Sequence, residues 1–155
     1  MTDRGLARRT LPALLVAALL LAACHRPAGD PVERTLNAIA AAARERDADA
    51  VLSRLASGFT GTGGLSLQET GVELRRYFAL YDSVEVGIAD LEIERPEPGI
   101  ARARFRVSLS GKPKAIGGLA GMLPDVERLR FEATLAERED WRLTAATWER
   151  LASTP

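Results

Sequence analysis

Residues 84–109 read VEVGIADLEIERPEPGIARARFRVSL, and this stretch determines the class of fold. Its apolar side chains alternate in two sets of opposite parity: Val84, Val86 and Ile88, then Leu91 and Ile93. A strand keeps one face apolar across such a change only if it carries an extra residue, so we expect a β-bulge near Ala89–Asp90 that bends a long strand. The turn at 95–99 ends this strand. Beyond it, Ala101 to Leu109 alternate with arginines and predict the antiparallel partner.

Two further segments repeat the two-residue period. Their inward-facing sets are Leu129, Phe131, Ala133 and Leu135, then Trp141, Leu143 and Ala145, before Trp148 changes parity. A turn at Glu139–Asp140 joins these two segments. Four consecutive strands of this kind predict an antiparallel meander.

Three segments upstream of the meander have helical signatures. Residues 30–33 read DPVE, which places an N-cap acid, a proline at the first helical position and a glutamate at the third. A second helix is expected from Asp47 to Ser57, with Gly58 as its stop. Residues 66–69 read SLQE, a capping box that opens a third helix ending near Tyr81. The sequence therefore predicts an α+β fold, in which N-terminal helices pack on a bent antiparallel β-meander.

The first 23 residues have the layout of an export signal. Met1 to Arg9 is short and basic, Leu11 to Ala23 is apolar apart from Pro12, and small residues precede Cys24. The apolar stretch is shorter than the roughly 20 residues that a membrane-spanning helix needs. Two alternatives to lipidation of Cys24 are open. Cys24 is an unmodified cysteine behind an ordinary cleavage site, or the apolar stretch stays uncleaved as an anchor.

The run Leu21-Ala22-Ala23-Cys24 resembles the lipobox of bacterial lipoproteins. The resemblance implies cleavage before Cys24, a diacylglyceryl thioether on its sulfur and anchoring of the chain in a membrane. His25 stands where an aspartate would retain enteric lipoproteins in the inner membrane, so we expect a periplasm-facing protein of the outer membrane. Residues 24–30 then form a tether of at most about 25 Å, and residues 31–151 form one domain.

The charge and cysteine content restrict the partners. Removal of residues 1–23, which hold three arginines and one aspartate, leaves 18 basic against 20 acidic side chains. A near-neutral domain without a basic stripe gives no footprint for nucleic acid. Cys24 is the single cysteine, so no disulfide framework exists and lipidation gives this residue a role.

The domain resembles the nuclear transport factor 2-like cone, also called the SnoaL-like or cystatin-like fold. The resemblance rests on two N-terminal helices, Phe59 after the second, a third helix ending in aromatic residues, the bulged strand, and a final strand reading DWRLTAATWER over 140–150. It implies a pocket between the sheet and the helices. The expected lining residues are Phe59, Tyr77, Phe78, Tyr81, Phe105, Phe131 and Trp148.

An inventory of reactive side chains tests for catalysis. His25 is the single histidine and lies beside the lipid, so no histidine base, triad or metal cluster is expected inside the domain. This excludes the histidine-dependent dehydratases of the fold. Ketosteroid isomerase, another member, uses aspartate and tyrosine in an apolar pocket, so Asp90 and Tyr77 are the nearest catalytic candidates, with Asp82 and Tyr81 behind them. The alternative is an exposed Asp90 and core tyrosines, and no cofactor is expected.

Three other segments invite functional hypotheses. Residues 58–64 read GFTGTGG but lack the order of a phosphate-binding loop. Phe59 is expected to fill the core, with a very short strand at this residue as an option. Six arginines are expected on one sheet face: Arg102, Arg104, Arg106, Arg128, Arg130 and Arg142. They form either an anion platform or a solvated charge ladder with Glu92, Glu94 and Glu132. The glycine-rich, apolar segment 111–125 is a lid, a docking element or a plug of the cone.

Three functions follow as hypotheses. The first is an envelope lipoprotein whose domain binds a small apolar ligand or an envelope protein, without catalysis. The second is a carboxylate- and tyrosine-dependent isomerase or hydrolase of the same fold. The third is a scaffold subunit of an envelope assembly, and homodimerisation through the outer sheet face is open in all three.

Overall fold

The computed structural model describes residues 29–114 and 126–152. Within them, helices and strands follow one another as α2 (Pro31–Arg44), α3 (Ala48–Leu52), β1 (Leu55–Thr60), the 3₁₀ turn η2 (Thr62–Gly64), α4 (Leu67–Leu80), β2 (Tyr81–Glu97), β3 (Ile100–Pro113), β4 (Val126–Glu137) and β5 (Trp141–Arg150). The signal segment, Cys24, His25 and most of the 111–125 segment lie outside the described residues.

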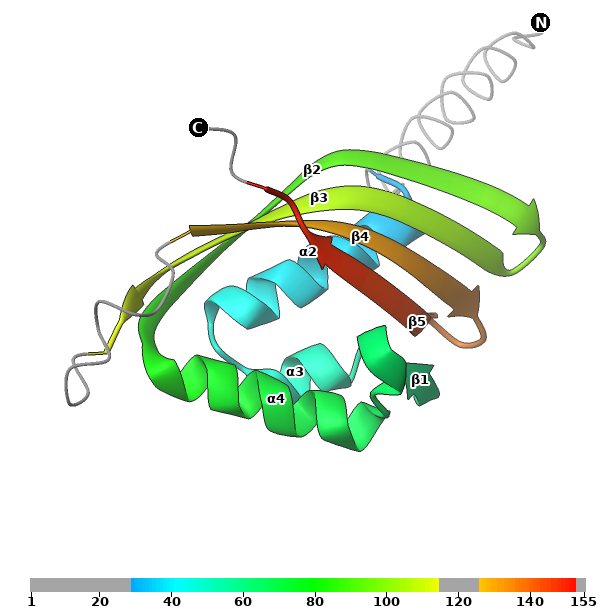
Figure 1. Cartoon of the computed structure of the whole chain (residues 1–155). Helices are drawn as coiled ribbons and strands as arrows, with labels where there is room; N and C mark the ends of the chain where they lie inside the picture. Colours follow the sequence, from blue (N-terminus) through cyan, green and yellow to red (C-terminus); the bar gives the residue numbers. More distant parts are fainter. Residues whose placement is uncertain (1–28, 115–125, 153–155) are drawn as a thin grey trace, which may run out of the picture.

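The strands form one five-stranded sheet in the order β1-β5-β4-β3-β2. β2 to β5 are antiparallel neighbours, as the predicted meander requires, while β1 adds to β5 in parallel. The sheet curls over α2, α3 and α4, which all lie on its concave side (Figure 1). The predicted α+β architecture is confirmed, and the parallel fifth strand makes the sheet mixed.

The β-bulge in β2 lies where the change of parity predicts it. The register with β3 shifts between Ala89 and Glu92, and Asp90 has a positive φ of 51°. The extra residue keeps the apolar side chains on both sides of it on the inner face. The following turn is shorter than expected, since β2 runs to Glu97 and only Pro98 and Gly99 connect it to β3.

A second irregularity lies in β5 and corrects the predicted alternation there. Leu143 pairs with Leu135 but Ala145 pairs with Thr134, so one residue of β5 is skipped between them. As a result Ala146 is buried and Ala145 is not. The parity therefore changes before Ala145, and not between it and Trp148.

The helix starts form as predicted. The side chain of Asp30 accepts a hydrogen bond from the backbone N–H of Val32 at 2.8 Å, which caps α2. Ser66 and Glu69 form both halves of a capping box at the start of α4. Each cap satisfies backbone N–H groups that a helix start leaves without partners.

The predicted second helix is wrong in its length. α3 ends at Leu52, and Leu55–Thr60 forms β1 beside β5. Leu55 and Phe59 are both buried, and their spacing of four residues fits the period of a helix as well as that of a strand. The backbone carbonyl of Arg54 accepts from the N–H of Leu143, which starts the strand pairing. Gly58 is thus an exposed residue inside a strand and not a helix stop.

The core lies between the concave sheet face and the helices. Its most deeply buried large side chains are Val32, Tyr81 and Leu135. None of the helices in the described ranges is both long and apolar enough to cross a membrane.

Candidate functional site

An apolar cavity of about 390 Å³ lies between the sheet and the helices. α2 and α4 form one wall, and the inner faces of β2 to β5 form the other. The volume is within the range of about 300–1,000 Å³ that small-molecule sites occupy. Six of the seven aromatic residues predicted for the pocket line it: Phe59, Tyr77, Phe78, Phe105, Phe131 and Trp148. The seventh, Tyr81, is 1% exposed and packs beside the cavity without lining it.

Three aromatic rings form a row across the sheet side of the cavity. Phe105, Phe131 and Trp148 are direct neighbours on β3, β4 and β5. The ring centroids of Phe105 and Phe131 lie 5.3 Å apart and those of Phe131 and Trp148 5.6 Å apart, both stacked. Such a row offers a flat apolar surface to a bound molecule.

A polar group without a hydrogen-bond partner among the described residues lies in the helix wall of the cavity. Thr70 of α4 lines the cavity, and its Oγ1 is buried without a hydrogen-bond partner among the described residues. A helical threonine usually donates to the carbonyl three or four residues earlier, but this one does not. Because most buried polar atoms are hydrogen-bonded, the orphaned hydroxyl marks this wall as a candidate polar contact.

Tyr77 supplies a second polar group about two helical turns further along α4. Burial raises the pKa of its hydroxyl well above the ordinary value, and the neighbouring Tyr81 hydroxyl and the charge of Glu127 act in the same direction. The two tyrosine rings lie 4.8 Å apart. Tyr77 therefore keeps its proton at neutral pH, and its hydroxyl shares a hydrogen bond with the hydroxyl of Tyr81.

Glu127 brings a carboxylate to the same cavity from β4. Its Oε1 accepts from Nη2 of Arg150 at 2.8 Å, and its side chain is 15% exposed against 74% for the arginine. Glu73 of α4 also lines the cavity. Sequence analysis missed both acids, although Glu127 has the same strand parity as the inward-facing Leu129 and Phe131 and could have been found by extending that set.

The structure separates the two predicted catalytic residues. Asp90 lies on the outer face of the sheet, with its side chain 56% exposed and paired to Arg106. Tyr77 lies on the inner side, in the cavity wall. Asp82 is also exposed. The bulge that presents Asp90 turns its side chain away from the cone, so the Asp90–Tyr77 pair does not form a site.

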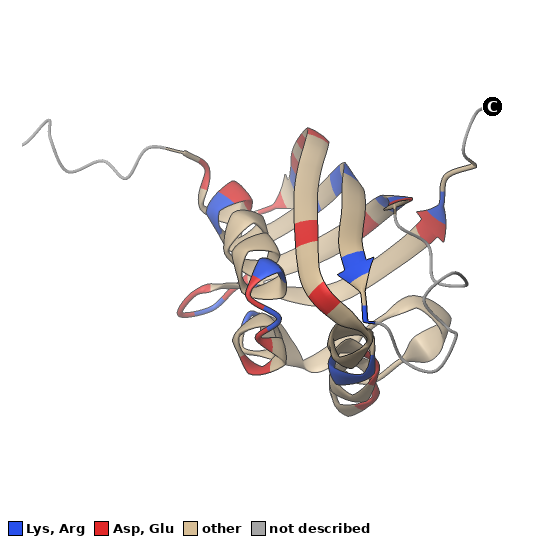
Figure 2. Cartoon of the chain, turned by 90° about the vertical axis from the view of Figure 1, so that its left-hand side faces the viewer, with Lys and Arg blue, Asp and Glu red and all other residues tan. Residues whose placement is uncertain are grey.

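The outer sheet face carries a ladder of opposite charges. Arg104 pairs with Glu94 and Glu132, Arg106 with Asp90, and Arg130 with Glu149, all on side chains that are more than half exposed. Figure 2 shows acidic and basic residues interspersed over the strands and not gathered by sign. Pairs of this kind contribute about 0–1 kcal/mol each, which supports the solvated ladder over an anion platform.

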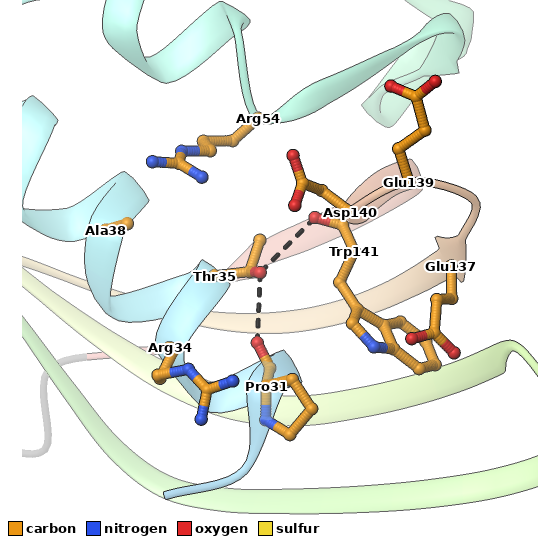
Figure 3. Close-up of a pocket in the computed structure, with 9 residues that line it drawn as sticks. All are labelled: Pro31, Arg34, Thr35, Ala38, Arg54, Glu137, Glu139, Asp140 and Trp141. Carbon is orange, nitrogen blue, oxygen red and sulfur yellow. Dashed lines mark hydrogen bonds between the residues drawn. The ribbon is translucent and has the colours of Figure 1, made fainter. Parts of the chain in front are cut away.

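A second, polar pocket of about 440 Å³ opens where the start of α2 meets the β4–β5 turn. Arg34 and Arg54 lie on one side of it, and Glu137, Glu139 and Asp140 lie on the other (Figure 3). In residues 29–114 and 126–152 no group of three or more histidine, cysteine or acidic side chains is placed to hold a metal ion.

Comparisons with known proteins identify the fold but no family. No protein-family model matches the chain. No curated protein matches it either.

Solved structures of low sequence identity share the architecture. A proposed scytalone dehydratase of Novosphingobium aromaticivorans superposes with a TM-score of 0.70 at 10% identity, over 94% of this chain and 91% of that one. A ketosteroid isomerase-like protein of Erwinia carotovora atroseptica gives 0.60 at 15% identity, over 78% and 94%. An uncharacterised protein with a cystatin-like fold from Caulobacter vibrioides gives 0.62 at 12% identity, over 79% and 89%. The chain therefore has the nuclear transport factor 2-like, cystatin-like cone fold that the sequence resemblance implied.

Proposed function

We propose that this chain is a lipid-anchored protein of the bacterial envelope whose cone binds one small, mainly apolar molecule. The observation that carries the proposal is the aromatic-lined cavity, which the side chains of the cone leave open. Dehydratase-like and isomerase-like proteins with this fold support a ligand-binding cone. A cavity filled by its own side chains would instead favour a scaffold.

The polar groups of the cavity specify the kind of molecule. Tyr77 offers a hydroxyl that shares a hydrogen bond with Tyr81, Thr70 offers a hydroxyl without a partner among the described residues, and the carboxylate of Glu127 is already neutralised by Arg150. An apolar body that carries a neutral oxygen fits this set best, because it would stack on the aromatic row and hydrogen-bond to α4. An anionic ligand would meet no cation among the described lining residues, whereas the carboxylate of Glu73, which forms no ion pair among them, leaves one counter-charge for a cationic group.

Catalysis is not part of the proposal. The isomerase or hydrolase hypothesis rested on Asp90 and Tyr77. The fold separates them, because Asp90 lies on the outer face of the sheet and Tyr77 lies on α4 inside the cone. A binding role needs only the cavity and its hydrogen-bonding groups, both of which lie in the described residues.

The envelope location rests on residues 1–24. The basic start, the short apolar stretch and the LAAC run support export, cleavage and lipidation of Cys24. Several acyl chains make such an anchor stable, whereas one chain would give marginal binding. The tether leads directly into Asp30, the cap of α2.

Dye binding tests the cavity. N-phenyl-1-naphthylamine, an uncharged dye that fluoresces in apolar sites, is titrated into the full chain. Ala43 lines the cavity from α2, and Ala43→Phe fills it, so we expect dye affinity to fall by about tenfold or more. Ala41→Phe is the matched control, since Ala41 is exposed on the same helix. Equal dye affinity in the two variants would show that the cavity is not the site.

A further inference from the structure

The polar pocket beside α2 is built on a rigid frame. The hydroxyl of Thr35, which is 8% exposed, lies within hydrogen-bond distance of the carbonyls of Pro31 at 3.1 Å and Trp141 at 3.3 Å, and so joins α2 to the start of β5 (Figure 3). The backbone carbonyl of Arg54 accepts from the N–H of Leu143 at 3.0 Å, which fixes the opposite rim to the same strand. The charged side chains therefore project from a frame that does not need to fold around a ligand.

The charges of this pocket are separated by sign. Arg54 stands on one rim, and Asp140 with Glu139 stands on the other (Figure 3). Among the described residues the guanidinium of Arg54 forms no ion pair, and neither carboxylate forms one. Opposite charges that line one pocket without meeting leave room for a molecule that carries both complementary charges.

The pocket lies next to the entry of the tether. Arg34, which lines it, donates from Nη1 to the carbonyl of Gly29 at 2.6 Å, and so holds the last part of residues 24–30 against α2. If Cys24 carries lipid, as the proposed function states, this tether keeps the pocket within about 25 Å of the membrane surface. Phospholipid head groups are then present near the pocket at high local concentration.

We propose that this pocket binds a small zwitterion of the phosphoethanolamine type. The phosphate meets the guanidinium of Arg54, and the ammonium meets Asp140 and Glu139. Arg34 and Thr35 position the two rims and the tether. Two sources supply this chemistry, the head group of phosphatidylethanolamine and a free soluble zwitterion, and the pocket recognises the group that they share.

The two tryptophans of the chain allow the two sites to be observed separately. Trp141 lines the polar pocket and Trp148 lines the cone cavity. In Trp148→Phe, Trp141 is the single tryptophan and reports on the polar pocket. In Trp141→Phe, Trp148 reports on the cavity. Failure of the zwitterion proposal thus leaves the dye experiment on the cavity unaffected.

The test titrates O-phosphoethanolamine into the full-length Trp148→Phe chain and follows Trp141 fluorescence. We expect saturable binding, and at least about tenfold weaker binding of ethanolamine or inorganic phosphate alone. Arg54→Gln and Asp140→Asn are expected to weaken binding by about tenfold or more, since each removes a charged contact. Arg138→Gln, an exposed residue of the same turn outside the pocket lining, is the matched control and keeps its affinity.

Vesicles distinguish the two sources. If the lipid head group is the ligand, the chain in phosphatidylethanolamine vesicles no longer responds to O-phosphoethanolamine, whereas it responds fully in phosphatidylglycerol vesicles. If a free zwitterion is the ligand, the response is equal in both. The proposal is overturned if no saturable response occurs, if either half-molecule binds as tightly as the whole, or if Arg138→Gln weakens binding as much as Arg54→Gln.

Discussion

The hydroxyl of Thr70 is expected to destabilise the empty cone, because it is buried without a hydrogen-bond partner in residues 29–114 and 126–152. Thr70→Val keeps the shape of the side chain and removes the unsatisfied oxygen. We expect the free energy of unfolding, measured with urea, to rise by about 1 kcal/mol. In the control Thr62→Val it falls by a similar amount, because Oγ1 of Thr62 accepts from the N–H of Trp148 at 2.9 Å.

The same Thr70→Val variant connects stability to function. A ligand oxygen that bonds to Thr70 would lose this bond in the variant, so the natural ligand should bind more weakly to a more stable protein. A loss of stability in Thr70→Val would contradict the account, since it would mean that the hydroxyl has a partner in the folded chain.

The hydroxyl of Tyr77 makes stability depend on alkaline pH. Burial raises its pKa above the ordinary value of 10, so the folded chain keeps this proton more tightly than the unfolded chain does. The contribution to stability is complete below pH 10 and is lost progressively as the pH rises further. We expect the urea-measured free energy of unfolding to fall less steeply above pH 10 in Tyr77→Phe than in the natural chain. Identical slopes would show that Tyr77 is not protected by the fold.

At the scale of elements, β2 and β3 approach each other closely at Gly111. A Cβ added to Gly111 would stand 2.7 Å from the carbonyl oxygen of Ser83 and 2.7 Å from a ring carbon of Tyr81. The former atom belongs to the backbone and the latter to a side chain that is 1% exposed, so neither can move easily. Gly111→Ala is expected to destabilise the fold by about 1–3 kcal/mol.

Gly58→Ala is the matched control for this clash. Gly58 lies in a strand too, but a Cβ there meets nothing within 4 Å. Its replacement should be neutral or stabilising by up to about 1 kcal/mol, because alanine restricts the unfolded chain. Thermal or urea unfolding compares the two variants, and equal effects would contradict the close approach in β3.

The elements that could be predicted from the sequence are marked by local sequence features such as capping residues or a change of parity. Both capped helix starts and the bulge in β2 form where side-chain chemistry or parity places them. The sequence predicts only a very short strand at Phe59 and extends the helix to Ser57, because Leu55 and Phe59 fit two periods equally. Only the pairing of β1 with β5, far away in sequence, decides between the two periods. The segment 111–125 begins later than expected, since Gly111–Pro113 belong to β3, and residues 115–125 lie outside the described range.

The lining residues whose position depends on strand parity could be predicted from the sequence. Those whose position depends on the curvature of the strands could not. Alternation places Phe105 and Phe131 on the inner face, and both line the cavity. The bulge was placed correctly from the sequence, but the direction in which it turns Asp90 depends on a positive φ that no pattern reveals. Tyr81 follows α4 directly, but as the first residue of β2 it is buried in the packed core beside the cavity.

At the scale of the whole molecule, the proposed anchor depends on one sulfur atom. Cys24→Ser removes the thioether, so we expect no incorporation of radiolabelled palmitate, accumulation of the uncleaved chain and release from the outer-membrane fraction. Lipid labelling and fractionation of cells that express each form measure this. Unchanged labelling and fractionation in Cys24→Ser would contradict lipidation, while the cone and its cavity would be unaffected.

The cavity of the cone is the centre of this account, and native mass spectrometry of the full chain purified from its own envelope tests it most directly. The account predicts a non-covalent added mass of one small molecule, beyond the covalently lipidated mature chain, on the natural chain and on Ala41→Phe. It predicts that Ala43→Phe, in which the cavity is filled, lacks this non-covalent mass. A natural chain without non-covalent added mass, or a non-covalent mass that Ala43→Phe retains, would contradict it.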